Sequence, residues 1–418
     1  MNYLTVVFIG MLALSSAVRS WLIGRHIRYV SEHKNSVPEA FLDSIGSEAH
    51  RKAADYTVAK SRLNLAGLIL DLTLALLWTI GGGLKLLDST WRAAGANQMN
   101  TGVIVICCYA LINALIALPL NIYSTFGIES SFGFNRIRVK TYLLDMAKLL
   151  LLAAILGIPL LYAALWLMGY SKHLWWLYVW LLWLGFSLLL TWAYPVLIAP
   201  WFNKFTPLAD PALKQRIESL LQRCGFSSRG VFVMDGSTRS AHGNAYFTGF
   251  GNNKRIVFFD TLMDKLIPEE IEAVLAHELG HFRMKHVIQR LVVAAILSLA
   301  GLGILAWLSA HSWFYQGLGV PQASSYMALL LFSLLAPPFL SLIEPLSSAW
   351  SRRHEFQADA YASRYANATD LVHALVKLYR DNATTLTPDP LHSAYHDSHP
   401  PAVTRIAHLR QLARTTGH

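Results

Sequence analysis

The sequence is poor in charged residues and in cysteine. Asp, Glu, Lys and Arg make up 14% of its 418 residues, against about 25% in soluble globular domains. Only three cysteines are present; two of them, Cys107 and Cys108, are neighbours in an apolar run, so a disulfide framework is excluded. Because 54% of the residues are apolar, disorder and a coiled coil are excluded as well.

The net charge of +10 does not form a single basic patch. The basic residues are spread over several loops between apolar runs, which argues against nucleic-acid binding. Such spreading is typical of a membrane protein that keeps its basic loops on the cytoplasmic side.

Seven stretches are long and apolar enough to cross a bilayer as helices, which takes about 20 residues. The first is predicted to be a signal-anchor, because its arginines follow the apolar run. A kink is predicted at Pro337-Pro338 in the last. The predicted fold class is therefore an all-α multi-pass membrane protein, with spans over 3–24, 63–87, 102–124, 143–168, 173–199, 287–310 and 326–350.

The distribution of Lys and Arg predicts how these spans are oriented. The connections after the second, fourth and sixth spans hold at most one such residue each, whereas those after the fifth and seventh hold 11 and 8. The positive-inside rule therefore predicts an outside N-terminus and a cytoplasmic C-terminus. The long connection and the C-terminal tail would then meet on one side of the membrane.

Four parts of the chain are expected from this pattern. Residues 1–199 would hold the first five spans, 200–286 a cytoplasmic segment, 287–350 the last two spans, and 351–418 a C-terminal segment. In the cytoplasmic segment, helical spacing covers 210–224 and a short strand 231–235. The runs 244–250 and 255–260 read as a hairpin, since Gly251-Asn252-Asn253 separates them. Another helix begins at Pro268, where proline suits the first turn.

The helix from Pro268 carries a zinc-binding pattern. His277 and His281 are four residues apart, so both imidazoles project from one helical face and can bind one metal ion. Glu278 follows the first histidine and would accept a proton from the water in the metal's open position. The alternative is a polar helix face with two unrelated histidines.

The third protein ligand is expected after the seventh span. Glu355 and Asp359 are again four residues apart on one predicted helix. A carboxylate ligand, with a second carboxylate accepting the free N–H of a metal-bound histidine, would complete a site for one Zn²⁺. The alternative is a solvated acidic face beside neighbouring arginines.

Several further motifs make the chain resemble the type I CAAX prenyl proteases, which are integral-membrane zinc metalloendopeptidases. The resemblance covers nearly the whole chain. It implies seven helices forming a barrel around a large water-filled chamber, closed at one end by a gluzincin-like protease domain with a small sheet. The motifs that carry it are Ala53-Ala54-Asp55-Tyr56, Phe132-Gly133-Phe134-Asn135, Ala199-Pro200-Trp201-Phe202-Asn203-Lys204-Phe205, Ser240-Ala241-His242-Gly243-Asn244-Ala245-Tyr246, the zinc segment, Glu355-Phe356-Gln357-Ala358-Asp359 and Ser398-His399-Pro400-Pro401.

The resemblance also implies roles for residues outside the zinc pattern. Asn244 and His399 match family positions thought to steady the substrate or the tetrahedral intermediate, and an amide or imidazole can stabilise an oxyanion. Arg405 matches a family arginine near the site, which implies that it anchors a carboxylate or the substrate backbone. If 244–250 is an edge strand, it could bind an extended peptide by strand addition. Gly243 departs from the family pattern, since many relatives have serine there.

Two acidic residues lie deep in the spans, where ionisable groups normally face protein or water. These are Asp71 and Glu344. Glu344 precedes Glu355 by eleven residues, about three helical turns, so both would share a face if Pro345 does not break the helix. Both acidic residues are therefore predicted to line the chamber.

The predicted function is zinc-dependent hydrolysis of peptide bonds in an integral membrane protein. The substrate would be a prenylated CaaX protein at the endoplasmic reticulum, or a misfolded membrane protein at a bacterial inner membrane; the oligomeric state stays open. Two alternatives are a transporter or channel, and an inactive scaffold with structural zinc. The open fourth position argues against a structural zinc, which usually has four protein ligands.

Overall fold

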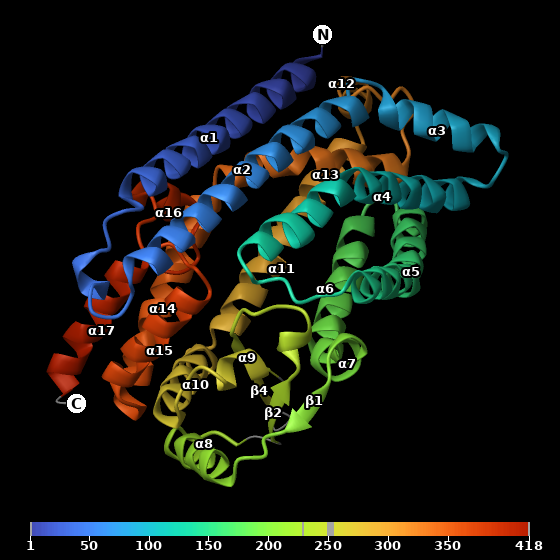
Figure 1. Cartoon of the computed structure of the whole chain (residues 1–418). Coiled ribbons are helices and arrows are strands. Elements are labelled where there is room, and N and C mark those ends of the chain that lie inside the picture. The colour runs from blue at the N-terminus through green and yellow to red at the C-terminus, as the bar shows by residue number, and fades with distance from the viewer. Residues whose placement is uncertain (1, 228–229, 249–254, 417–418) are drawn as a thin grey trace.

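The computed structural model describes residues 2–227, 230–248 and 255–416. It is mainly helical, with one small sheet near the end opposite to α3 and α12 (Figure 1). Within the described residues, six helical segments are long and apolar enough to span a membrane, and a bent pair makes a seventh. The predicted multi-pass helical fold is confirmed. The six are α1 (Tyr3–His33), α2 (Ser47–Trp78), α4 with the following π-helix (Gln98–Glu129), α5 (Val139–Tyr170), α6 to α7 (Trp175–Phe202) and α11 (His286–Ser309).

The second predicted span, 63–87, differs from the helix that forms. Helix α2 begins much earlier, at Ser47, and ends at Trp78; the amphipathic helix α3 (Gly83–Ala93) follows as a separate element. Gly81 and Gly82 lie between them, and Gly82 has a φ of 78°, a conformation that glycine adopts at little cost. The apolar run therefore continued past the end of the helix.

The seventh predicted span, 326–350, is broken. Helices α13 (Ser325–Ser341) and α14 (Glu344–Tyr365) meet at an angle of 64°. Pro337 and Pro338, where a kink is predicted, lie inside α13, and the break between the two helices comes after them. Pro345 sits in the first turn of α14. There it lacks the N–H that would bond the Ser341 carbonyl and its ring would clash with that carbonyl, so α13 cannot continue. The Tyr395 hydroxyl donates to the Ser341 carbonyl instead, at 2.5 Å.

The segment after the fifth span forms a four-stranded mixed sheet with helices packed beside it. The order is β1-β2-β4-β3, so β3 is an edge strand; it pairs antiparallel with β4 and lies next to α10. This confirms the predicted strand pairing, while Gly251-Asn252-Asn253 lie outside the described residues. The elements are β1 (Phe205–Pro207), α8 (Pro211–Arg223), β2 (Val231–Met234), β3 (Ala245–Thr248), β4 (Arg255–Phe259), α9 (Asp260–Met263) and α10 (Pro268–Arg283).

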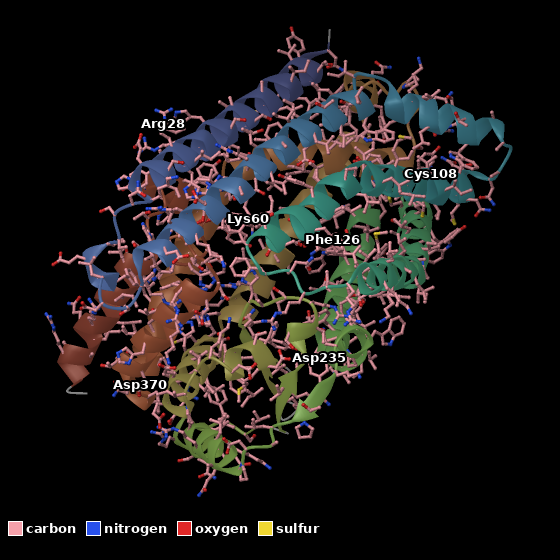
Figure 2. The ribbon with its side chains drawn as sticks, in the orientation of Figure 1. Arg28, Lys60, Cys108, Phe126, Asp235 and Asp370 are labelled. Carbon is pink, nitrogen blue, oxygen red and sulfur yellow. The ribbon has the colours of Figure 1, made fainter. Side chains whose placement is uncertain are left out.

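The C-terminal segment completes the lower part of the molecule. Helices α15 (Ala368–Asp381), α16 (Pro390–His396) and α17 (Ala402–Thr416) pack against α10 and α14. One apolar core joins α15 and α17 to the sheet and α8, whereas a second core holds the membrane helices together with α12 (Ser312–Gly317). Figure 2 marks Cys108 in the membrane helices, and Asp235 and Asp370 in the lower part.

A polar and aromatic junction joins the two parts. The Tyr56 hydroxyl on α2 donates to Glu129 at 2.5 Å, and His242 Nε2 lies 3.3 Å from the same carboxylate. The His242 ring stacks on Phe134 at 4.4 Å, while the Ala241 N–H donates to the Phe134 carbonyl. Three of the motifs quoted above therefore meet at one place, ahead of β3.

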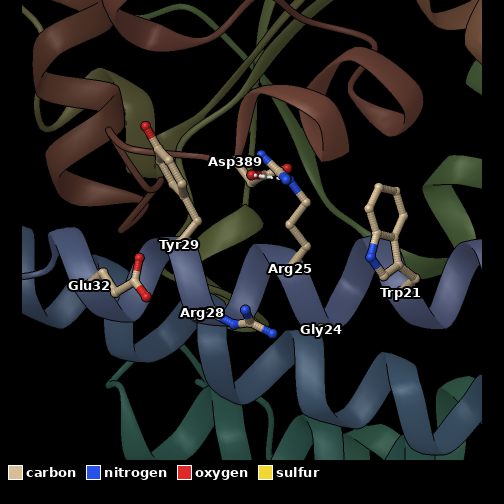
Figure 3. A pocket seen from close by; sticks show the side chains of 7 residues that line it. All are labelled: Trp21, Gly24, Arg25, Arg28, Tyr29, Glu32 and Asp389. Carbon is tan, nitrogen blue, oxygen red and sulfur yellow. Dashed lines mark hydrogen bonds and ion pairs between the residues drawn. The ribbon is translucent and has the colours of Figure 1, made fainter.

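A second connection ties α1 to the C-terminal segment (Figure 3). The guanidinium of Arg25 lies 2.8 Å from the carboxylate of Asp389, which is fully buried. Asp389 also accepts the His392 N–H at the start of α16. A cavity of about 350 Å³ lies beside this pair, and none of the predicted zinc ligands lines it.

Replacing Asp389 by alanine should destabilise the protein by about 2–4 kcal/mol, because one substitution removes a helix cap and a hydrogen bond to a charged group. Asp210 supplies a matched control, since it caps α8 and has no ion pair among the described residues; its alanine variant should lose only about 1 kcal/mol. Thermal unfolding in detergent measures both. Equal losses for the two variants would contradict the structural role given to the Arg25 pair.

Candidate active site

Helix α10 presents the two predicted histidine ligands. Its start is stabilised by Glu270, whose carboxylate accepts the Ile267 N–H at 3.0 Å. One helical turn separates His277 from His281, and their Nε2 atoms approach to 3.2 Å. Both side chains are largely buried.

Helix α14 brings a buried carboxylate to the same point. Glu355 Oε2 lies 3.5 Å from His277 Nε2, and Oε1 lies 3.4 Å from His281 Nε2. Bonds of about 2.0–2.1 Å to a tetrahedral zinc ion place neighbouring ligand atoms roughly 3.3 Å apart. The three side chains therefore have the donor chemistry and the spacing of a zinc site. Within the described residues they form the group that could hold a metal ion.

The Glu355 carboxylate points to the same conclusion. Its Oε2 atom is buried and has no properly oriented hydrogen bond within the described part of the chain, although His399 Nδ1 lies 2.8 Å away. A buried carboxylate oxygen without a hydrogen bond is costly. A cation at the centre of the three ligand atoms would compensate for that cost.

Asp359 and Arg405 lie behind His277. Asp359 Oδ1 is 2.8 Å from His277 Nδ1, and the Arg405 guanidinium binds both Asp359 oxygens at 2.7 and 2.9 Å. Arg405 Nη1 also lies 3.4 Å from Glu355. Burial opposes the charge on Arg405, but Asp359 outweighs it and keeps the pKa of the guanidinium raised. The pair therefore fixes the ring of His277, with Nδ1 toward Asp359 and Nε2 toward His281 and Glu355.

The metal-free site should bind zinc more tightly as the pH rises. Burial and Arg405 lower the pKa of His277, but the hydrogen bonds to Asp359 and Glu355 have the larger effect and raise this pKa to about 9. Zinc binds the neutral imidazole, so below this pH a proton must leave His277 first. The apparent zinc dissociation constant should therefore rise roughly tenfold for each unit by which the pH falls.

Competition with a chelator at pH 6.5, 7.5 and 8.5 measures this dependence. The stability of the metal-free protein depends on pH in the opposite direction to its zinc affinity. The protonated His277 stabilises the fold fully below about pH 6.5, and this contribution is lost as the pH rises toward 9. A dissociation constant independent of pH would contradict the assignment of His277 as a ligand.

The other predicted catalytic residues lie at different places. Glu278 is half-buried beside the first ligand on α10. His399 is mostly exposed and reaches Glu355 from the loop before α17. Asn244 is exposed at the start of β3, and its side-chain oxygen accepts the Ala245 N–H. The described contacts do not join Asn244 directly to the three ligand side chains.

The two acidic residues of the spans are not at the zinc-type site. Asp71 lines a cavity of about 280 Å³ between α1, α2, α4 and α13. The Glu344 carboxylate lies 2.8 Å from His396 Nδ1 on α16. Helix α14 starts at Glu344, so this residue and Glu355 do belong to one helix.

A cavity of about 820 Å³ adjoins the site. His399 and Arg405 line it on one side, and Tyr56 and Lys60 of α2 line it on the other. This volume is in the range of pockets that enclose small ligands. The site is therefore open to a molecule lying between α2 and the C-terminal segment.

Two residues at the site were not singled out from the sequence. His286 contacts His281, and Tyr379 of α15 hydrogen-bonds Arg405. Burial raises the pKa of Tyr379, so its hydroxyl stays neutral. Each belongs to a helix other than the one that carries its partner, and no local spacing pairs them.

Comparisons with known proteins agree with this geometry. Residues 26–204 match the family model described as CAAX prenyl protease N-terminal, five membrane helices, and residues 207–413 match peptidase family M48. The chain is similar to CAAX prenyl protease 1 of Saccharomyces cerevisiae, with 34% identity over 93% of this chain and 91% of the yeast protein. The human CAAX prenyl protease 1 homolog is 29% identical over 97% and 96% of the two chains.

A solved structure extends the likeness to the fold. The crystal structure of S. mikatae Ste24p matches with a TM-score of 0.89 and 32% identity, covering 98% of this chain and 99% of that one. The similarity covers nearly the whole chain, including the membrane helices and the candidate metal ligands, and so does not depend on a single motif. The chain belongs to the CAAX prenyl protease 1 family of M48 peptidases, and it is a multi-pass membrane zinc metalloendopeptidase.

Proposed function

We propose that His277, His281 and Glu355 bind the zinc ion and that Asp359, held by Arg405, orients His277. The observation that carries this proposal is the set of 3.2–3.5 Å separations between their ligand atoms. Bound zinc would supply a Lewis acid that polarises the scissile carbonyl and makes a water molecule acidic.

Glu278 would be the general base. A carboxylate beside the first ligand can take the proton of the attacking water and return it to the leaving amine. His399 and Asn244 would stabilise the negative charge that develops on the carbonyl oxygen. The position of His399, 2.8 Å from Glu355, supports this role. Asn244 is supported by its place at the start of β3, which lies next to α10.

The edge strand β3 would hold the substrate backbone. Strand addition needs an unpaired strand edge close to the ligands, and β3 pairs only with β4 among the described strands. The adjoining 820 Å³ cavity would accept the chain beyond the scissile bond. We propose that the substrate is the C-terminal CaaX segment of a prenylated protein, the class that the names of the relatives indicate.

The site would face the cytoplasm, with the N-terminus on the outer or lumenal side. Support comes from the basic residues of 200–286 and 351–418, the two segments that build the site. Residues 1–199 and 287–350 would form the membrane part around a chamber, at a bacterial inner membrane or an endoplasmic reticulum membrane. Asp71 and Glu344 would line that chamber.

One experiment tests the substrate class. Purified zinc-loaded protein is incubated with a farnesylated CaaX peptide and, separately, with an unmodified fragment of a membrane protein, each with and without a zinc chelator. We expect chelator-sensitive release of the tripeptide from the first. Cleavage of the unmodified fragment alone would indicate quality-control proteolysis. Cleavage that survives chelation would overturn the mechanism.

A further inference from the structure

The second histidine ligand has a different support from the first. His286 is the first residue of α11 and its side chain is buried. Its Nδ1 atom lies 2.9 Å from Nδ1 of His281. Lys285, with a φ of 58°, turns the chain sharply between α10 and α11. This left-handed residue brings His286 back against the helix that carries the ligands.

The hydrogen-bonding roles of these two rings follow from the metal site. If Nε2 of His281 binds zinc, its Nδ1 carries the proton and must donate to Nδ1 of His286. His286 then carries its own proton on Nε2. That atom lies 3.0 Å from the side-chain oxygen of Gln357, which accepts a hydrogen bond. Each atom in this chain therefore has one consistent role.

The ring of His286 is also held on its flat face. His354 stacks on it with centroids 3.8 Å apart and an interplanar angle of 8°. His354 Nε2 is in turn 3.2 Å from the Gln289 side chain. Gln357 lies between Glu355 and Asp359 on α14. These contacts therefore link His281, through His286 and Gln357, to α14, the helix that carries Glu355.

The two histidine ligands differ in the charge behind them. Asp359 supports His277, and its charge is balanced by Arg405. A neutral imidazole supports His281, so no second anionic charge reaches the metal through that ligand. The partners behind a metal-binding histidine fix its tautomer and ring orientation.

We propose that His286 is a positioning residue that holds His281 in its zinc-binding tautomer and is itself held by Gln357. This inference rests on the proposed ligands. It adds a residue that acts through His281 and touches neither zinc nor substrate.

The test measures zinc loss to an excess of chelator and compares three variants with the wild type. His286→Phe keeps a ring but loses the acceptor, and it should release zinc about 10–100-fold faster. His286→Asn can place an amide oxygen near the position of Nδ1, so it should stay within about threefold of the wild type. His354→Phe keeps a ring for stacking and loses the contact with Gln289, so it should also stay within about threefold.

A coupled pair keeps the test decisive if His286→Phe does not fold. Gln357→Leu should speed zinc release in the wild type but not in His286→Asn, because an amide oxygen accepts a hydrogen bond whatever Gln357 does. An asparagine variant that releases zinc as fast as the phenylalanine variant would overturn the inference. So would equal effects of Gln357→Leu in both backgrounds. A wild-type protein that binds no zinc would instead overturn the ligand assignment.

Discussion

Glu278→Gln should lower kcat by roughly 10²–10⁴-fold, the usual contribution of a general base, while the protein keeps its zinc. Glutamine has nearly the same shape as glutamate but cannot take a proton from water. Because Glu278 is not one of the three metal-type side chains, zinc should remain bound and KM should change little. Single-turnover cleavage of the farnesylated peptide, with metal analysis of the same sample, measures both quantities.

A control on the same helix separates this effect from a general loss of charge. Glu269 lies in the first turn of α10, where it pairs with Arg216 at the surface. Glu269→Gln should leave kcat within about twofold, because exposed ion pairs contribute little. If Glu278→Gln kept a tenth or more of the activity, another group would have to act as the base.

Glu355→Gln should abolish zinc retention and, with it, peptide cleavage. Loss of a protein ligand removes a direct bond to the metal, so the effect should exceed the roughly 10–100-fold that follows loss of a partner behind a ligand. Glutamine keeps the size of the side chain in a buried position. Metal content after dialysis against chelator, measured together with the melting temperature, distinguishes zinc loss from unfolding.

Two further variants should give a graded series. Asp359→Asn weakens the support of His277 and should fall in the 10–100-fold range. Glu218 is exposed on α8, so Glu218→Gln should have no effect. Equal zinc retention in Glu355→Gln and Glu218→Gln would exclude Glu355 as a ligand.

The pairing within each candidate ligand segment could be predicted because short-range geometry governs it. Residues four apart share a helix face whatever the tertiary fold, which placed His277 beside His281 and Glu355 beside Asp359. That the two pairs meet depended on a second argument, the basic loops that set both segments on one side of the membrane. The structure brings them within 3.5 Å.

The partners that come from other helices could not be predicted in this way. His286 reaches His281 only because Lys285 adopts a positive φ, and non-glycine residues adopt that conformation rarely. Nor could the break before α14 be assigned to one proline from the sequence. Three prolines lie near this break, and each leaves one backbone carbonyl without its helical hydrogen bond. Hydropathy does not show which of these carbonyls finds another donor. Here that group is the Tyr395 hydroxyl, more than fifty residues away from Ser341.

The order of the ligands along the chain has a consequence for biosynthesis. The two histidines lie on α10, ahead of the sixth span, whereas Glu355 lies on α14, the second helix of the bent pair, and Arg405 comes later still. During translation, a nascent chain that has exposed the histidine helix still lacks the carboxylate, so it cannot yet hydrolyse its neighbours. With the proposed ligands, the zinc site is complete only after the chain has been synthesised through α14.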